Sequence, residues 1–104
     1  MAPFDIYIAT RKWRNSDSDR PWLLIRPTAV GWLAFAISTK DYDSNPFEIR
    51  RDDPDFPATG LTDTSYVYEA ETFTELRTEL LQKRLGRIEG NLLKAFLKYS
   101  GITA

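Results

Sequence analysis

Two apolar runs stand close together in this chain, at residues 22–25 and 31–38. Both are enriched in β-branched and aromatic residues, which favour strands, and a glycine starts the second run. Five residues, 26–30, separate the two runs, too few for the helical crossover that parallel strands require. Because both runs are apolar at nearly every position, we expect an antiparallel pair at the centre of a sheet, buried on both faces.

Other segments show the shorter patterns of strands and loops. Residues 4–9 alternate strictly between apolar and other side chains, as in a half-buried strand. Residues 47–51 alternate in the same way, and residues 65–70 have the composition of another strand. Turn-forming residues predict loops between these strands, at residues 10–19, 41–46 and 52–60.

The C-terminal third of the chain predicts a further strand and a helix. The leucines of residues 74–85 fit a helical face only in part, so we expect a short helical turn followed by a strand that ends near Ile88. Apolar residues then recur at helical spacing over residues 92–100. Gly-Asn at residues 90–91 is placed to cap the start of this helix, and Gly101 is placed to end it.

The expected elements limit the fold class. Five or six short strands with brief connections cannot form a parallel sheet with helical crossovers, so a small antiparallel barrel is the economical solution. A chain of 104 residues, 42% hydrophobic and 13% aromatic, has the size and composition of one domain with one core. We therefore predict a single, mainly β domain over residues 1–104, with a C-terminal α-helix and one short additional helical turn.

The composition excludes several function classes, because the chain contains no cysteine and no histidine. Disulfides, thiolate metal sites, cysteine nucleophiles, histidine general bases and serine–histidine–acid triads are all ruled out. We therefore predict no metal site and no cofactor. The formal net charge of −1 requires any affinity for nucleic acid to come from local clusters. No signal-peptide pattern and no apolar stretch of membrane length is present, which predicts a cytoplasmic protein without membrane contact.

One local basic cluster lies in the first predicted loop. Arg11, Lys12, Trp13 and Arg14 interleave three positive charges with an aromatic ring. This composition suits phosphate contact and base stacking in single-stranded RNA, so the cluster is a candidate RNA-binding site. A charged loop that serves only solvation is an equally simple interpretation.

Six segments of the chain form a known pattern when taken in order. They are Asp-Ile-Tyr-Ile-Ala at residues 5–9, Arg-Pro-Trp-Leu-Leu-Ile at 20–25, Ala-Ile-Ser-Thr at 36–39, Thr-Ser-Tyr-Val at 64–67, Lys-Arg-Leu-Gly-Arg-Ile at 83–88, and the terminal amphipathic helix. In this order the chain resembles the MazF/PemK family of toxins from type II toxin–antitoxin systems. The resemblance implies an SH3-like barrel of the CcdB/Kid type, usually a homodimer. It also implies metal-independent cleavage of single-stranded RNA and neutralisation by an antitoxin protein.

The resemblance also implies catalytic residues. In the family, the arginine of an Arg-Pro pair and a threonine or serine at the end of the next long strand are the central catalytic groups. The matching residues here are Arg20 and Ser38, with Thr39 beside Ser38. Two segments depart from the family pattern. Residues 15–19 replace a Gly-Ser-Glu-like loop, and residues 68–71 stand where some members carry an arginine and an aspartate.

These residue types suit the implied chemistry. Attack of an RNA 2′-OH on its own phosphate needs a proton acceptor, stabilisation of the phosphorane and a proton donor to the leaving 5′-oxygen. Arg20 offers a planar fork of donors that matches phosphate oxygens and keeps its charge. The hydroxyls of Ser38 and Thr39 can orient a phosphate oxygen or the attacking 2′-OH. The structural alternative is that Arg20 is a solvated arginine paired with Asp17 or Asp19, beside two polar residues at a strand end.

Other aromatic and basic residues have structural interpretations as well. Trp22 and Trp32 lie in apolar runs, so we expect them in the core or in a dimer interface. Lys83, Arg84 and Arg87 either meet acidic residues of an antitoxin or form a solvated strand face.

The leading functional hypothesis is therefore an endoribonuclease toxin that acts on single-stranded RNA. A second hypothesis is a non-catalytic or diverged module on the same barrel that acts on a protein partner. It is motivated by the departures at residues 15–19 and 68–71. A third, an SH3-like adaptor for peptides, has no positive support in the sequence.

Overall fold

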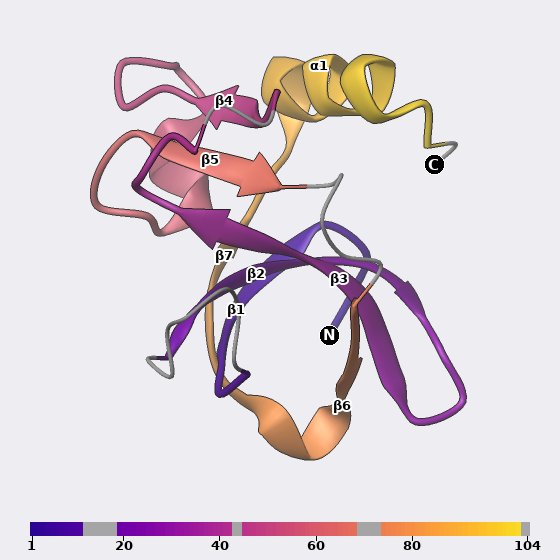
Figure 1. The fold of residues 1–104 in the computed structure, drawn as a ribbon. Coiled ribbons are helices and arrows are strands. Elements are labelled where there is room, and N and C mark those ends of the chain that lie inside the picture. The colour runs from indigo at the N-terminus through magenta and orange to yellow at the C-terminus, as the bar shows by residue number, and fades with distance from the viewer. Residues whose placement is uncertain (12–18, 43–44, 69–73, 103–104) are drawn as a thin grey trace.

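A computed structural model describes residues 1–11, 19–42, 45–68 and 74–102 (Figure 1). The described elements are seven strands, one α-helix and two short 3₁₀ turns. In chain order they are β1 (Asp5–Ala9), β2 (Arg20–Pro27), β3 (Gly31–Ser38), β4 (Phe47–Ile49), η1 (Phe56–Thr59), β5 (Ser65–Tyr68), β6 (Thr74–Arg77), η2 (Thr78–Leu80), β7 (Leu81–Arg87) and α1 (Gly90–Ser100).

The strands form one antiparallel sheet with β2 and β3 at its centre. The strand order is β4-β5-β3-β2-β1-β7. The strand β6 pairs with residues 31–34 of β3, and β5 pairs with residues 36–38 of the same strand. Trp22 pairs with Ala36, Leu23 with Phe35 and Leu24 with Ala34. The predicted mainly β, antiparallel architecture with a terminal helix is confirmed. Within the described residues the sheet is not closed into a barrel, because β7 pairs only with β1 and β6 pairs only with β3.

The two central strands are buried on both faces, as predicted. Leu23 and Ile25 belong to a first core, whereas Trp22 and Leu24 belong to a second core on the opposite face of the sheet. Trp22 is fully buried and Trp32 is 8% exposed, so both indoles lie in the core, one of the two predicted locations.

The terminal helix closes the first core. In Figure 1, α1 lies beside β4, at the end of the molecule far from β6. Its buried residues are Leu92 and Phe96. The centroid of the Phe96 ring lies 5.3 Å from that of Phe47, 6.3 Å from that of Phe4 and 6.4 Å from that of Phe35. Aromatic pairs at these separations add to the free energy gained from burial alone, which fixes the helix on the sheet.

The two ends of α1 differ from each other in how they are capped. Gly101 adopts a left-handed conformation and its N–H donates to the Leu97 carbonyl at 2.9 Å, which confirms the predicted C-terminal cap. The prediction that Gly90 or Asn91 caps the start was wrong. The N-cap residue is Glu89, and its side chain makes no capping bond. Instead the Asp55 carboxylate, 37 residues away in the chain, accepts from the Leu92 N–H at 3.1 Å.

The segment before the helix was predicted only in part. The expected helical turn is η2, and the strand that follows it is β7. The strand β6, which precedes the turn, was not predicted. In β6, Thr74 and Leu76 are buried while the two other residues are exposed, a period of two that the helical spacing of the leucines concealed.

The predicted loop at residues 52–60 contains η1, which packs directly on β7. Gly60 follows η1 with a φ of +72°, and a Cβ built on it would lie 2.0 Å from the Leu85 carbonyl oxygen. Gly86 approaches the same segment from the other side, since a Cβ there would lie 2.2 Å from the Ala58 carbonyl oxygen. Two backbones in contact without side chains between them fix the loop after η1 on the sheet.

The close approach at Gly60 can be tested against a matched glycine. Gly101 has nearly the same φ, +73°, but nothing lies within 4 Å of an added Cβ. Gly101→Ala should therefore cost only the left-handed strain, about 1 kcal/mol of the free energy of unfolding. Gly60→Ala carries the same strain plus a backbone clash and should cost at least about 2 kcal/mol more. Urea denaturation of both variants measures the difference, and equal losses would contradict the contact.

Candidate functional site

A cavity of about 470 Å³ lies where β2 begins and β3 ends. This volume falls within the range of about 300–1,000 Å³ that is typical of small-molecule sites. The lining residues come from β1, β2, β3, the loop after η1, β5 and β7. They are Ile8, Arg20, Pro21, Ile37, Ser38, Thr39, Gly60, Leu61, Thr62, Ser65 and Leu85. All three predicted catalytic residues, Arg20, Ser38 and Thr39, are among them, and we call these three the strand-end cluster.

The register of the central strands brings the strand-end cluster together. Trp22 is paired with Ala36, so Arg20 and Ser38, each two residues beyond this pair, lie at neighbouring ends of β2 and β3. One guanidinium nitrogen of Arg20, Nη1, donates to the Ile37 carbonyl oxygen at 3.4 Å. The cation is therefore held against the backbone of the residue that precedes Ser38.

The Ser38 hydroxyl has a defined hydrogen-bond direction. Its oxygen accepts from the Lys40 N–H at 3.1 Å. The hydroxyl proton is therefore the group that Ser38 can offer to a ligand. The loop that supplies the Lys40 amide is fixed by Tyr68, whose hydroxyl donates to the Lys40 carbonyl at 2.6 Å and accepts from the Tyr42 N–H at 2.8 Å.

Charge in the described lining of the cavity comes from Arg20 alone. Burial lowers the pKa of the Arg20 guanidinium, and the neighbouring Tyr42 opposes this shift. An arginine remains cationic at any relevant pH even so. A cation that is partly removed from water and lies next to hydroxyl donors is suited to binding an anion.

The opposite wall of the cavity is mainly apolar. Ile8, Pro21 and Ile37 continue the face of the sheet that carries the first core, and Leu61 and Leu85 cover them from the loop after η1 and from β7. The Thr59 side chain holds this loop, since its oxygen accepts from the Leu61 N–H at 3.2 Å and its hydroxyl donates to the Phe56 carbonyl at 2.6 Å. We call the residues Ile8, Pro21, Ile37, Leu61 and Leu85 the apolar wall.

The predicted RNA-binding cluster is only partly described. Arg11 is exposed just beyond β1, whereas Lys12, Trp13 and Arg14 lie outside the described residues. The Thr10 hydroxyl donates to the Asp19 carboxylate at 2.8 Å, which joins the two ends of this loop next to Arg20. Asp19, one of the two partners suggested for Arg20, thus has a hydrogen bond to Thr10, and the other, Asp17, lies outside the described residues.

Sequence reasoning missed the residues that the loop after η1 and β5 add to the cavity. Ser65 starts β5 and is placed by the pairing of β5 with β3, next to Tyr66, the partner of Ser38. Leu61 and Thr62 lie in the loop after η1, which the backbone contact of Gly60 with β7 holds near the strand-end cluster. No local sequence signal marks such a contact in advance.

Sequence reasoning also passed over Glu48. It is the hydrogen-bond partner of Tyr66, whose pKa is raised first by burial and then by the charges of Glu48 and Asp41. Tyr66 is opposite Ser38, and Glu48 is opposite Tyr66. Two strand spacings, about 10 Å, therefore separate Glu48 from Ser38. Glu48 shares their face of the sheet but does not line the cavity.

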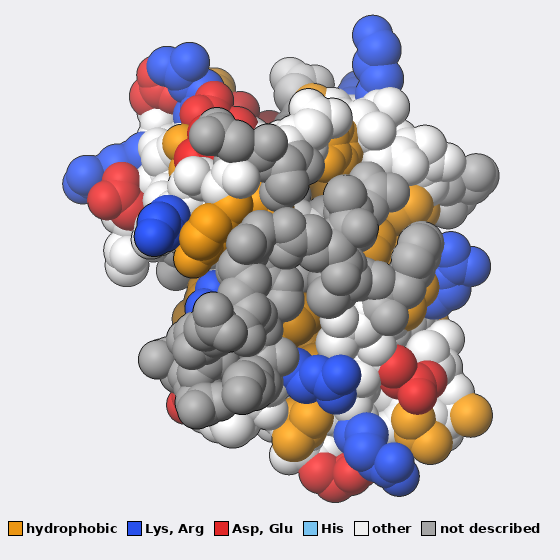
Figure 2. Space-filling model, in the orientation of Figure 1, with side chains coloured by type: hydrophobic (Ala, Val, Ile, Leu, Met, Phe, Trp, Pro, Cys, Tyr) orange, Lys and Arg blue, Asp and Glu red, His pale blue; other side chains and the backbone are white. Residues whose placement is uncertain are grey.

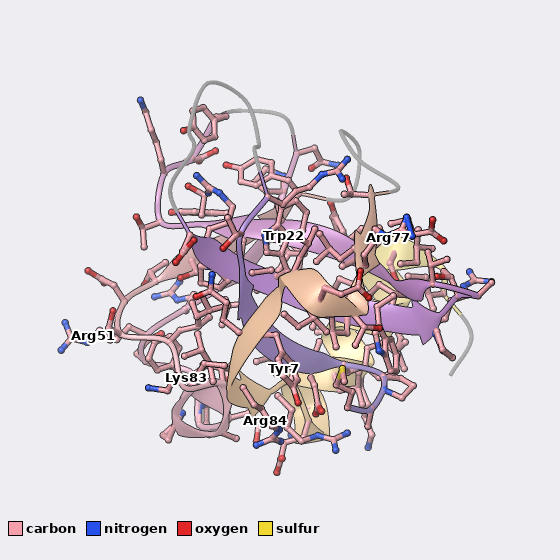
Figure 3. The ribbon with its side chains drawn as sticks, turned by 90° about the horizontal axis from the view of Figure 1, so that it is seen from below. Tyr7, Trp22, Arg51, Arg77, Lys83 and Arg84 are labelled. Carbon is pink, nitrogen blue, oxygen red and sulfur yellow. The ribbon has the colours of Figure 1, made fainter. Side chains whose placement is uncertain are left out.

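The basic residues of β7 are not part of this site. Figure 3 shows Lys83 and Arg84 on the same part of the molecule as Tyr7, with Arg51 and Arg77 on opposite sides of the view. Arg84 is bound to the buried carboxylate of Asp5 at 3.4 Å. On the face seen in Figure 2, positive and negative side chains are both present and no large area of one sign is visible. The described surface in these views is thus of mixed charge, as the net charge of −1 suggests.

Comparison of the chain with family models, with curated proteins and with solved structures gave no significant match. The similarity to the MazF/PemK family therefore stays a prediction. Along residues 1–11, 19–42, 45–68 and 74–102, no helix is long and apolar enough to cross a membrane. The same residues contain no group of three His, Cys, Asp or Glu side chains that could hold a metal ion.

The composition of the cavity predicts anion binding that does not depend on pH near neutrality. Among the described lining residues only Arg20 carries a charge, and the whole chain lacks histidine and cysteine. The affinity for sulfate, which does not titrate in this range, should be constant between about pH 6 and about pH 9. Chemical-shift titration of the Ser38 and Thr39 amides measures it. Arg20→Ala should abolish binding and Arg26→Ala, on the exposed end of β2, should preserve it. An inflection near neutral pH would contradict this description of the site.

Proposed function

We propose that this protein is a metal-independent endoribonuclease that cleaves single-stranded RNA through attack of the RNA's own 2′-OH. One observation carries the proposal: the central register brings Arg20, Ser38 and Thr39 to a single cavity. The order of sequence segments that resembles the MazF/PemK family adds the biological setting. In that setting the protein is the toxin of a toxin–antitoxin pair, acts as a homodimer and is neutralised by its antitoxin.

The strand-end cluster supports a defined division of roles. The 2′-oxygen forms a bond to phosphorus, the bond from phosphorus to the 5′-oxygen breaks, and the products are a 2′,3′-cyclic phosphate and a 5′-hydroxyl. The Arg20 guanidinium stabilises the extra negative charge of the phosphorane. Ser38, whose oxygen already accepts from the Lys40 amide, donates its proton toward a phosphate oxygen. Thr39 is exposed at the mouth of the cavity and supplies a second hydroxyl.

Charge stabilisation is the main contribution of the described site. Its lining residues include no carboxylate and no imidazole, so they hold no conventional general base. The proton of the 2′-OH passes to solvent in this scheme, and the leaving 5′-oxygen takes a proton from solvent. The arrangement therefore lowers the barrier through preorganised donors, which are usually the largest single contribution to enzymatic rate enhancement.

The same absence of a carboxylate among the described lining residues favours a second candidate function. A cation and hydroxyl donors without a base bind an anionic ligand but do not require that it reacts. In this alternative the protein is a non-catalytic binding module whose strand-end cluster holds an acidic or phosphorylated group of a protein partner.

Incubation of the purified protein with mixed single-stranded RNA in EDTA distinguishes the two functions. The proposal predicts cleavage with 2′,3′-cyclic phosphate ends, because no step needs a metal. Single-stranded DNA of the same sequence should stay intact, since it lacks the attacking 2′-OH. Arg20→Ala should lower the cleavage rate at least about a hundredfold and Ser38→Ala about tenfold or more.

Arg26→Ala is the matched control, because Arg26 is an exposed arginine on the same strand. It should leave the rate within about twofold of the wild type, and thermal unfolding should show that all the variants are folded. RNA that remains intact with the wild-type protein would refute the nuclease. Equal losses in Arg20→Ala and Arg26→Ala would remove the strand-end cluster from the mechanism.

A further inference from the structure

The cavity is larger than the strand-end cluster needs. A volume of about 470 Å³ leaves most of the space beside the apolar wall once a phosphate group is bound next to Arg20 and Ser38. The apolar wall is continuous with the first core, so an apolar or aromatic part of a ligand can be removed from water there.

Two serines of the cavity, on the neighbouring strands β3 and β5, have opposite hydrogen-bond directions. Ser38 accepts from a backbone N–H and is left with a proton to donate, which suits a phosphate oxygen. Ser65, which is 2% exposed, donates its proton to the Asp63 carbonyl at 2.9 Å and is left with lone pairs to accept. A ligand that satisfies both serines carries an anionic acceptor at one end and an N–H donor at the other.

The wall that carries Ser65 and Leu61 is built before any ligand arrives. Gly60 is in backbone contact with Leu85, and Leu61 is tied to Thr59 through its N–H. A preformed wall holds a planar group without an ordering cost at the moment of binding.

The geometry points to a nucleotide subsite in this cavity: the phosphate lies at the strand-end cluster, and the attached nucleobase lies against Leu61 and Leu85 with an N–H directed to Ser65. The identity of the ligand as one unit of an RNA strand rests on the proposed function. Arg20 supplies the positive charge that complements the phosphate. The apolar wall packs against the faces of the base, and Ser65 accepts a hydrogen bond from an N–H on the edge of the base. The subsite makes the cavity the point where the protein discriminates between bases next to the bound phosphate.

Titration with small ligands tests the subsite without any cleavage. The probes are the four ribonucleoside 3′-monophosphates and ribose 5-phosphate, followed by methyl and amide chemical shifts of the wild-type protein. At least one nucleotide should bind about tenfold more tightly than ribose 5-phosphate and should shift the Leu61 and Leu85 methyl signals. Equal affinity for the nucleotides and the ribose phosphate would overturn the subsite.

Three variants separate the parts of the site. Ser65→Ala and Leu61→Ala should each weaken nucleotide binding severalfold and leave ribose 5-phosphate binding unchanged, whereas Arg20→Ala should weaken both. Leu93→Ala is the control for Leu61→Ala, because Leu93 is another half-buried leucine that packs on the first core but does not line the cavity. If Ser65→Ala and Leu61→Ala weaken both classes of ligand equally, the subsite is wrong.

The outcome is independent of the cleavage assay. Discrimination between nucleotides and ribose phosphate in a protein that leaves RNA intact would keep the subsite and reject the nuclease. Cleavage of RNA by a protein that binds nucleotides and ribose phosphate equally would keep the nuclease and reject the subsite.

Discussion

The pairing of β2 with β3 is the constraint on which the rest of this structure depends. Both strands are buried on both faces, so a slip by one residue would exchange the first core with the second along the whole pair. The register is therefore fixed by packing on two sides at once. Arg20 and Ser38 sit at the ends of these strands, and their proximity follows from the same register that orders the cores.

The surrounding loops convert this proximity into a cavity. Tyr68, buried in the second core, fixes the loop after β3 through two hydrogen bonds and so sets the direction of the Ser38 hydroxyl. On the other side, the contact of Gly60 with β7 sets the apolar wall. The candidate site is thus supported by the core on one side and by backbone contact on the other, which favours a preorganised site.

The parts of the fold that could be predicted from the sequence are those set by the spacing of apolar residues along the chain. The two apolar runs gave the central strands, and the spacing of apolar residues before Gly101 gave the helix with its C-terminal cap. The features that escaped prediction depend on contacts between distant residues. Asp55 caps α1 through the Leu92 N–H, 37 residues away in the chain, and β6 is a strand because it pairs with the first half of β3, residues 31–34.

The candidate site divides in the same way. Arg20, Ser38 and Thr39 could be named from the sequence because the chain resembles a known family in those segments and because antiparallel neighbours bring strand ends together. Leu61 could not be named, since its place in the cavity is set by a backbone contact between Gly60 and Leu85 that no periodicity encodes. Ser65 could not be named because its position beside Ser38 depends on the pairing of β5 with β3, two strands that are distant in the chain.

The central claim is that Arg20 and Ser38 hold the same phosphate group, and a double-mutant cycle on RNA binding tests it most directly. The ligand is a 2′-O-methylated single-stranded RNA, which cannot be cleaved, and its affinity is measured for the wild type, Arg20→Ala, Ser38→Ala and the double variant. If both groups bind one phosphate, the double variant should lose less binding free energy than the sum of the two single losses, with a coupling of about 1 kcal/mol or more. Losses that add within about 0.3 kcal/mol would show that the two residues act independently and would contradict the account.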